Sequence, residues 1–138
     1  MTQVLTLIAY LFVFLGQMNS EQSIQAIVEK QARAWENADT SAIVEDFAPN
    51  AVFIASGLSY PGIEAIKQAA EHYFQQFTAT KVTIKRVIID DYQGAVEWDW
   101  SDRNKKTGKR SQAEDAIIFE LQNDGKIRYW REYIEKKR

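Results

Sequence analysis

Apolar positions recur every three to four residues between positions 20 and 37, a spacing typical of an amphipathic helix. We expect a short second helix to begin at Asp39 or Thr40 and to end near Pro49. A third helix is expected to begin at Pro61, since proline suits the first helical turn. The predicted apolar stripes of these helices comprise Ile24, Ile27, Val28, Ala34, Trp35; Ile43, Val44, Phe47; and Ile63, Ile66, Ala70, Tyr73, Phe74, Phe77.

Alternating apolar and polar positions predict strands in the rest of the chain. Strands are expected at 51–55 and 81–91, and three more between 94 and 134. Gly108 and the pair Asp124-Gly125 mark the two hairpin turns of this last block. The stretch SGLSYPG at 56–62 reads as a loop. Three helices followed by a strand meander predict an α+β fold in which a curved sheet covers the helices.

One acidic residue falls on the apolar face of a central strand. Side chains alternate across a strand, so Asp115 and Ile117 share the more apolar face, which should point toward the helices. In the preceding strand, Trp98 and Trp100 also share one face. A carboxyl group in such a position either has a shifted pKa or binds something. The sequence therefore indicates a pocket here.

The last strand has two half-apolar faces. Trp130 and Glu132 lie on one face, whereas Tyr129 and Tyr133 lie on the other, and the pattern leaves open which one faces inward. A sheet that is apolar on both sides often pairs with a second copy, so we expect a homodimer. The alternative is that the tyrosines simply cover an exposed sheet face.

The chain contains four tryptophans, Trp35, Trp98, Trp100 and Trp130. Indole rings offer large flat surfaces and an N–H donor, which suits an aromatic-lined chamber for a planar or terpenoid molecule. The alternative is that these side chains form ordinary core.

Composition excludes several classes of function. With 138 residues, the chain is long enough for one domain with a core. There is no cysteine and one histidine, His72, which we interpret as a surface residue, so we expect no metal site. Six scattered glycines form no phosphate-binding loop, and we expect no organic cofactor. A net charge of −2 gives no general attraction to nucleic acid.

The first 17 residues form an apolar segment ahead of a single domain at 18–138. The run VLTLIAYLFVFLG at 4–16 is too short for an ordinary membrane-spanning helix. A signal peptide, a membrane tether, an extra helix and a true start at Met18 all remain open. Cytoplasmic location is favoured, with export or tethering as the alternative. A membrane partner is expected only if this segment acts as a tether.

Three stretches resemble the SnoaL-like, nuclear transport factor 2-like superfamily: QARAWENADTSAIVEDFAPNAVFIA, YPGIEAIKQAAEHYF and DGKIRYWREYIE. The resemblance spans about residues 21–135. It implies a cone-shaped fold of the ketosteroid isomerase type, with three N-terminal helices packed on a curved, mostly antiparallel sheet. It also implies an open-ended apolar cavity and dimerisation through the convex sheet face. The same cone serves isomerases, cyclases, hydrolases and binding proteins, so the fold does not settle the function.

Within this superfamily, the sequence is similar to limonene-type epoxide hydrolases around TGKR and DGKIRYWREY. Glu132 matches the position of their last-strand aspartate. Their arginine and first aspartate would fall on Trp98 and Trp100, and their water-holding pair near Phe53 and Ala55. Four of the five roles are therefore unfilled. The match favours the face of the last strand that carries Glu132 as the pocket-facing one.

The leading functional hypothesis is binding of a small hydrophobic or aromatic molecule in the cavity. The candidate ligand-binding residues are Trp35, Phe53, Trp98, Trp100, Ile117 and Trp130. The alternative is a cofactor-independent isomerase, cyclase or hydrolase that uses Asp115, with Glu132, as general acid and base. A third hypothesis is a protein-interaction module that acts through the convex face.

The partners of the two acids separate these hypotheses. A binding protein predicts that Asp115 is paired with Arg128, Arg131 or a tyrosine hydroxyl. An enzyme predicts an unpaired Asp115 with a raised pKa. For Glu132, a salt bridge to Arg128 or Arg103 is favoured over shared proton chemistry.

Overall fold

The computed structural model describes residues 21–138, so the apolar segment 1–17 and its alternatives lie outside the described residues. A first helix occupies residues 21–36. The elements that follow are α2 (Thr40–Glu45), β1 (Phe47–Ala55), β2 (Leu58–Pro61), α3 (Gly62–Gln76), β3 (Phe77–Asp90), β4 (Gln93–Asn104), β5 (Arg110–Leu121) and β6 (Ile127–Lys136). No helix among the described residues is long and apolar enough to cross a membrane.

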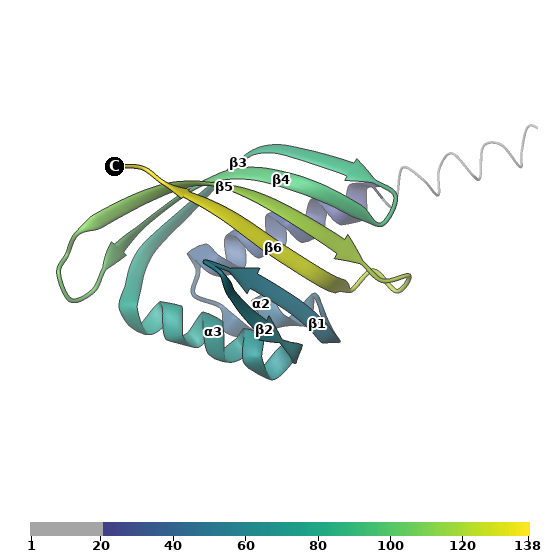
Figure 1. The fold of residues 1–138 in the computed structure, drawn as a ribbon, viewed down its shortest axis with the longest axis horizontal. Helices are drawn as coiled ribbons and strands as arrows, with labels where there is room; N and C mark the ends of the chain where they lie inside the picture. The colour runs from purple at the N-terminus through teal and green to yellow at the C-terminus, as the bar shows by residue number, and fades with distance from the viewer. Residues whose placement is uncertain (1–20) are drawn as a thin grey trace, which may run out of the picture.

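The six strands form one sheet in the order β2-β1-β6-β5-β4-β3. Strands β3 to β6 are an antiparallel meander, whereas β1 pairs with β6 in parallel and with β2 as an antiparallel hairpin. Figure 1 shows the long strands arching over the first helix, α2 and α3. This arrangement confirms the predicted α+β cone of three helices under a curved, mostly antiparallel sheet.

The first helix and α2 are joined through buried polar contacts. Val28 is fully buried, and beside it the side-chain amide of Gln31, with 1% exposure, donates to the backbone carbonyl of Ile43 at 2.9 Å. This bond satisfies a carbonyl near the end of α2 that would otherwise be left unpaired. Asp39 caps α2 by accepting from the backbone N–H of Ala42 at 3.0 Å. The predicted start of the second helix is therefore confirmed.

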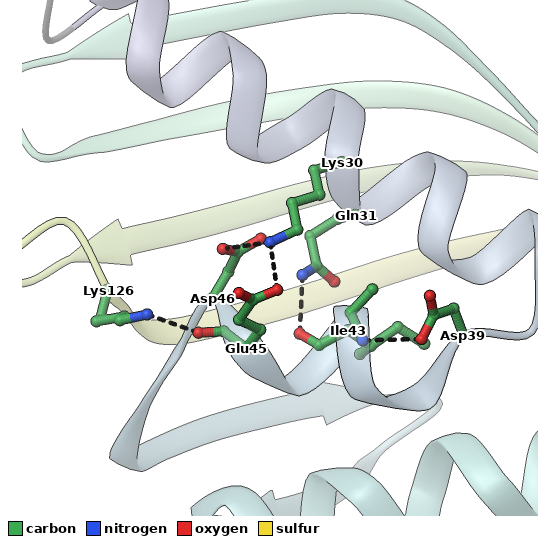
Figure 2. A network of polar contacts seen from close by, with 8 residues as sticks. Lys30, Gln31, Asp39, Ile43, Glu45, Asp46 and Lys126 are labelled. Carbon is green, nitrogen blue, oxygen red and sulfur yellow. Dashed lines mark hydrogen bonds and ion pairs between the residues drawn. The ribbon is translucent and has the colours of Figure 1, made fainter.

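Charged side chains fasten the turn that follows α2, as Figure 2 shows. Lys30 on the first helix contacts Glu45 at 2.8 Å and Asp46 at 3.3 Å. Lys126, from the turn between β5 and β6, donates to the backbone carbonyl of Glu45 at 2.7 Å. These contacts join the first helix, the end of α2 and the turn between β5 and β6.

Three predicted boundaries were wrong. Phe47 and Pro49 belong to β1 and not to the second helix, because pairing of Phe47 with Ile127 starts the parallel ladder early. The stretch 56–62 is not a plain loop, since Leu58–Pro61 pairs with β1. The strand expected at 81–91 begins at Phe77, directly after α3. Long-range pairing overrode the local pattern at the starts of β1 and β3, whereas β2 forms a local hairpin with β1 that the turn-like composition of 56–62 hid.

The concave face of the sheet carries the largest buried side chains. Trp98 and Trp130 are 0% and 1% exposed, and their ring centroids lie 6.0 Å apart. Phe119 stacks on Trp130 at 5.8 Å. A Cβ atom at Gly94 would lie 2.3 Å from the backbone oxygen of Ile88 and 2.6 Å from Phe119, so only glycine fits at that position.

The convex face is partly apolar, as the sequence predicted. Ile88, Ile118 and Tyr133 are 50%, 44% and 52% exposed, and Arg131 stacks over the Tyr133 ring at 4.8 Å. A homodimer, or another partner on this face, stays a prediction.

Candidate functional site

A cavity of about 370 Å³ lies between the concave sheet and α3. Its wall combines aromatic rings with three carboxyl groups. The first helix, α3 and all six strands contribute residues to it, although β3 contributes only its first residue, Phe77. The aromatic lining residues are Trp35, Phe53, Tyr60, Tyr73, Phe77 and Trp100, and the acids are Asp102, Asp115 and Glu132. The volume falls in the range of small-molecule sites.

Asp115 is buried at this wall, with 5% exposure. It stands directly opposite Trp98 in the β4–β5 ladder, and the Trp98 indole N–H donates to its Oδ2 at 3.1 Å. Its Oδ1 is buried without a hydrogen-bond partner. Burial raises the pKa of the Asp115 carboxyl to about 6; the bond from Trp98 opposes this rise, and the charge of Asp99 adds to it.

Glu132 is the second acid of this part of the wall. It is half-buried on β6, opposite Ile117, which places it diagonally across from Asp115 on the same face. The Trp130 indole N–H donates to its Oε1 at 3.1 Å. Burial, and then the nearby charge of Asp115, raise the pKa of the Glu132 carboxyl to about 8, against the effect of the Trp130 bond. The charge of Asp115 therefore favours the protonated form of Glu132.

Asp102 is a third acid, which the sequence reasoning missed. It is 7% exposed, and its Oδ2 accepts from the Tyr73 hydroxyl at 2.7 Å and from the Trp100 indole at 3.1 Å. Its Oδ1 accepts from the Ser111 hydroxyl. Burial raises the pKa of the Tyr73 hydroxyl above its usual range. The parity that set Trp98 and Trp100 on one face of β4 extends to position 102, so the signal was present in the sequence.

The structure divides the predicted ligand-binding residues into two groups. Trp35, Phe53 and Trp100 line the cavity together with both predicted acids. Trp98, Ile117 and Trp130 are buried in the core and are not among the residues of its wall, so their role in ligand binding stays a prediction. The curl of the sheet brings the indoles of Trp98 and Trp130 into mutual contact, and these two rings reach the site only through their N–H groups.

The expected partners of the acids were also wrong. Arg128 forms an ion pair with Glu120 at 2.7 Å and not with Glu132. No arginine or tyrosine hydroxyl contacts Asp115 among the described residues. His72 is exposed, as predicted, but it also lies at the wall of the cavity, hydrogen-bonded to Gln76 at 3.0 Å.

Residues 21–138 contain no cluster of histidine and acidic side chains arranged to hold a metal ion. The wall of the cavity itself offers carboxyl groups, tyrosine and serine hydroxyls, an imidazole, an amine and aromatic rings.

A curved six-stranded sheet over three helices, with a cavity between them, defines the α+β cone of the nuclear transport factor 2-like class. The model of the SnoaL-like domain matches residues 28–130, and the chain belongs to that family. A search among curated proteins found no match to the sequence.

Solved structures share the fold at low sequence identity. A ketosteroid isomerase-like protein from Catenulispora acidiphila, solved in complex with trimethylamine, is 19% identical with a TM-score of 0.72, over 78% of this chain and 83% of that chain. An NTF2-like protein from Exiguobacterium is 18% identical, with a TM-score of 0.71, over 79% and 98% of the two chains. SalBIII, an epoxide hydrolase/cyclase-like enzyme of pyran ring formation in salinomycin, is 20% identical, with a TM-score of 0.73, over 85% and 98%. These similarities show the fold alone.

Proposed function

We propose that the cavity binds a small, largely apolar molecule and that Asp115, with Glu132, moves a proton on that molecule. The observation that carries this proposal is Asp115 Oδ1, which is buried and accepts no hydrogen bond within residues 21–138. A carboxyl group with a purely structural role would be expected to have a cationic or hydroxyl partner. Asp115 also lines the cavity, so this oxygen is an acceptor that the protein leaves unpaired beside the proposed binding site.

The pKa values of the two acids suit opposite roles. With a pKa of about 6, Asp115 is largely ionised at neutral pH and can accept a proton. With a pKa of about 8, Glu132 largely keeps its proton and can donate it. A pair of this kind supports abstraction of a proton next to a carbonyl group and its return at another atom. One solved neighbour is described as an epoxide hydrolase/cyclase-like enzyme, which is compatible with this reaction class.

The aromatic wall also favours a second candidate, which is binding without turnover. Six aromatic side chains around the cavity provide the flat apolar surface that a hydrophobic ligand needs, whether or not a reaction follows. Asp115→Asn separates the two candidates. This isosteric change keeps an oxygen for the Trp98 indole and removes only the basic oxygen.

The test measures hydrogen–deuterium exchange in D₂O by proton NMR on a panel of small cyclic and aromatic ketones. We expect the wild-type protein to accelerate exchange next to the carbonyl of at least one compound. Asp115→Asn should slow it by about 100-fold or more, the contribution typical of general base catalysis. Glu135→Gln changes an exposed acid on the neighbouring strand β6; it is the matched control and should not change the rate.

The indole N–H resonances of the four tryptophans report binding in the same samples. Compounds that shift these resonances in both wild type and Asp115→Asn, without any exchange, would establish a binding protein and refute the proton-transfer role. Exchange that survives in Asp115→Asn would refute the assignment of Asp115 as the base.

A further inference from the structure

The carboxyl groups of the cavity lack ion-pair partners, although the rest of the chain is rich in them. Asp102, Asp115 and Glu132 take part in no salt bridge among the described residues, whereas every ion pair there lies outside the cavity. The basic side chains at the wall are the exposed Lys136 and His72, and neither contacts the three acids. The three acids of the cavity therefore have no basic partner among the described residues.

Asp102 accepts hydrogen bonds from three neutral donors, Tyr73, Trp100 and Ser111. Because Asp102 is 7% exposed, its field is screened less than that of a surface acid. A positive charge placed nearby would be attracted more strongly than in water.

Two of the donors to this acid, Tyr73 and Trp100, belong to a cluster of aromatic rings. The ring centroid of Trp100 lies 5.7 Å from Tyr73 and 5.8 Å from Trp35, and Phe77 stacks on Tyr73 at 5.1 Å. These four rings also line the cavity. The face of an aromatic ring attracts a cation through its quadrupole, and several rings together form a cage for alkylated ammonium groups.

We infer that the ligand of this cavity carries a positively charged amino or quaternary ammonium group, which is held by the rings of Tyr73 and Trp100 beside Asp102. This inference rests on the proposed function, since it takes the cavity to be the binding site, and it names the chemical class of the ligand. The apolar body of the molecule then extends toward Asp115 and Glu132. Recognition and proton transfer thus use different acids of one cavity.

The test compares two probes of nearly the same shape, choline and its uncharged carbon analogue 3,3-dimethylbutan-1-ol. Binding is followed through the assigned indole N–H resonances, with benzyltrimethylammonium as a larger cation. We expect the wild-type protein to bind choline about ten-fold or more tightly than the neutral alcohol, as one buried cation–aromatic contact with an added charge implies. The Trp100 resonance should shift most, since its N–H donates to Asp102.

Asp102→Asn should remove most of this preference and leave the affinity for the alcohol nearly unchanged. Glu135→Gln makes the same charge change on the exposed side of β6 and should leave both affinities unchanged. Equal affinity for the two probes, shifts confined to residues outside the cavity, or no binding of either cation would overturn the inference. If Asp102→Asn fails to fold, the wild-type comparison alone decides.

The failure of this inference is distinguishable from the failure of the proposed function. Ketone exchange that depends on Asp115, without any preference for cations, would leave proton transfer standing and remove the amine class. Selective cation binding without hydrogen–deuterium exchange on any ketone would support the amine class of ligand and remove the proton-transfer role.

Discussion

Asp115→Asn should make the protein more stable at neutral and alkaline pH, although it alters a buried residue at the proposed site. The carboxyl group of Asp115 is almost fully buried, has one neutral donor and no cation, and has one oxygen without any partner. Folding must therefore transfer a charge from water into a poorly compensating environment. An asparagine side chain has the same shape and needs no such transfer.

The direction of this pH dependence follows from the pKa of Asp115 in the folded protein and in the unfolded chain. The folded-state pKa is raised from 3.8 to about 6, so between these values the folded protein binds more protons than the unfolded chain. The free energy of unfolding therefore falls as pH rises through this window. Below and above the window, the titration of Asp115 no longer changes it. The full loss above the window is on the order of 2–3 kcal/mol, which Asp115→Asn should restore.

The assay is urea unfolding followed by tryptophan fluorescence, in steps from about pH 4 to about pH 8, where the raised pKa changes the protonation of the folded state. We expect the variant and the wild type to be similarly stable at the acid end and to diverge as pH rises. Removal of the Asp115 charge also lowers the pKa of Glu132, because that charge helps to raise it. Glu135→Gln should show no such divergence.

A constant difference between Asp115→Asn and wild type across the pH range would refute the reasoning, because it would show that burial does not raise the pKa of Asp115. A variant that becomes less stable than the wild type as pH rises would also refute the reasoning. It would point to a stabilising partner for the charged form.

Three further substitutions test other parts of the structure. Trp98→Phe removes the N–H that holds the pKa of Asp115 down, so carboxyl-carbon NMR titration should show a still higher pKa for that group. Gln31→Ala should lower the free energy of unfolding by about 1–3 kcal/mol, because it leaves the buried carbonyl of Ile43 unpaired. Gly94→Ala should lower it by about 1–3 kcal/mol or more, since the new Cβ would overlap a backbone oxygen and a phenylalanine ring. Urea unfolding measures both of these losses.

Matched changes elsewhere provide the controls. Gln25→Ala, on the exposed side of the first helix, should be nearly neutral beside Gln31→Ala. Gly57→Ala meets no atom within 4 Å, but it has a φ of +77°, so its cost should come from backbone strain alone and be smaller than that of Gly94→Ala. A Trp98→Phe variant with an unchanged Asp115 pKa would contradict the role given to the indole N–H.

Element type and side-chain facing could be predicted because both depend on spacing along the chain. The three-to-four repeat of the first helix and the alternation around Asp115 specified a helix and an inward acid without knowledge of the fold. The limits of β1 and β2 could not be read in this way. The partners of β1 include residues 127–131, and no local pattern around Pro49 encodes that pairing; β2 is an edge strand that pairs only with β1.

The composition of the site shows the same division. Parity along single strands brought Trp98, Trp100 and Asp115 to the concave face, and extended by one step it would have added Asp102. For Glu132 parity left the face open, and only the family resemblance favoured the inward side. Whether an inward side chain reaches a cavity or fills the core depends on how sharply the sheet curls and on where α3 lies. Those properties arise from packing between distant segments, so only the tertiary structure could place Trp100 at the wall and Trp98 in the core, and leave one oxygen of Asp115 without a partner.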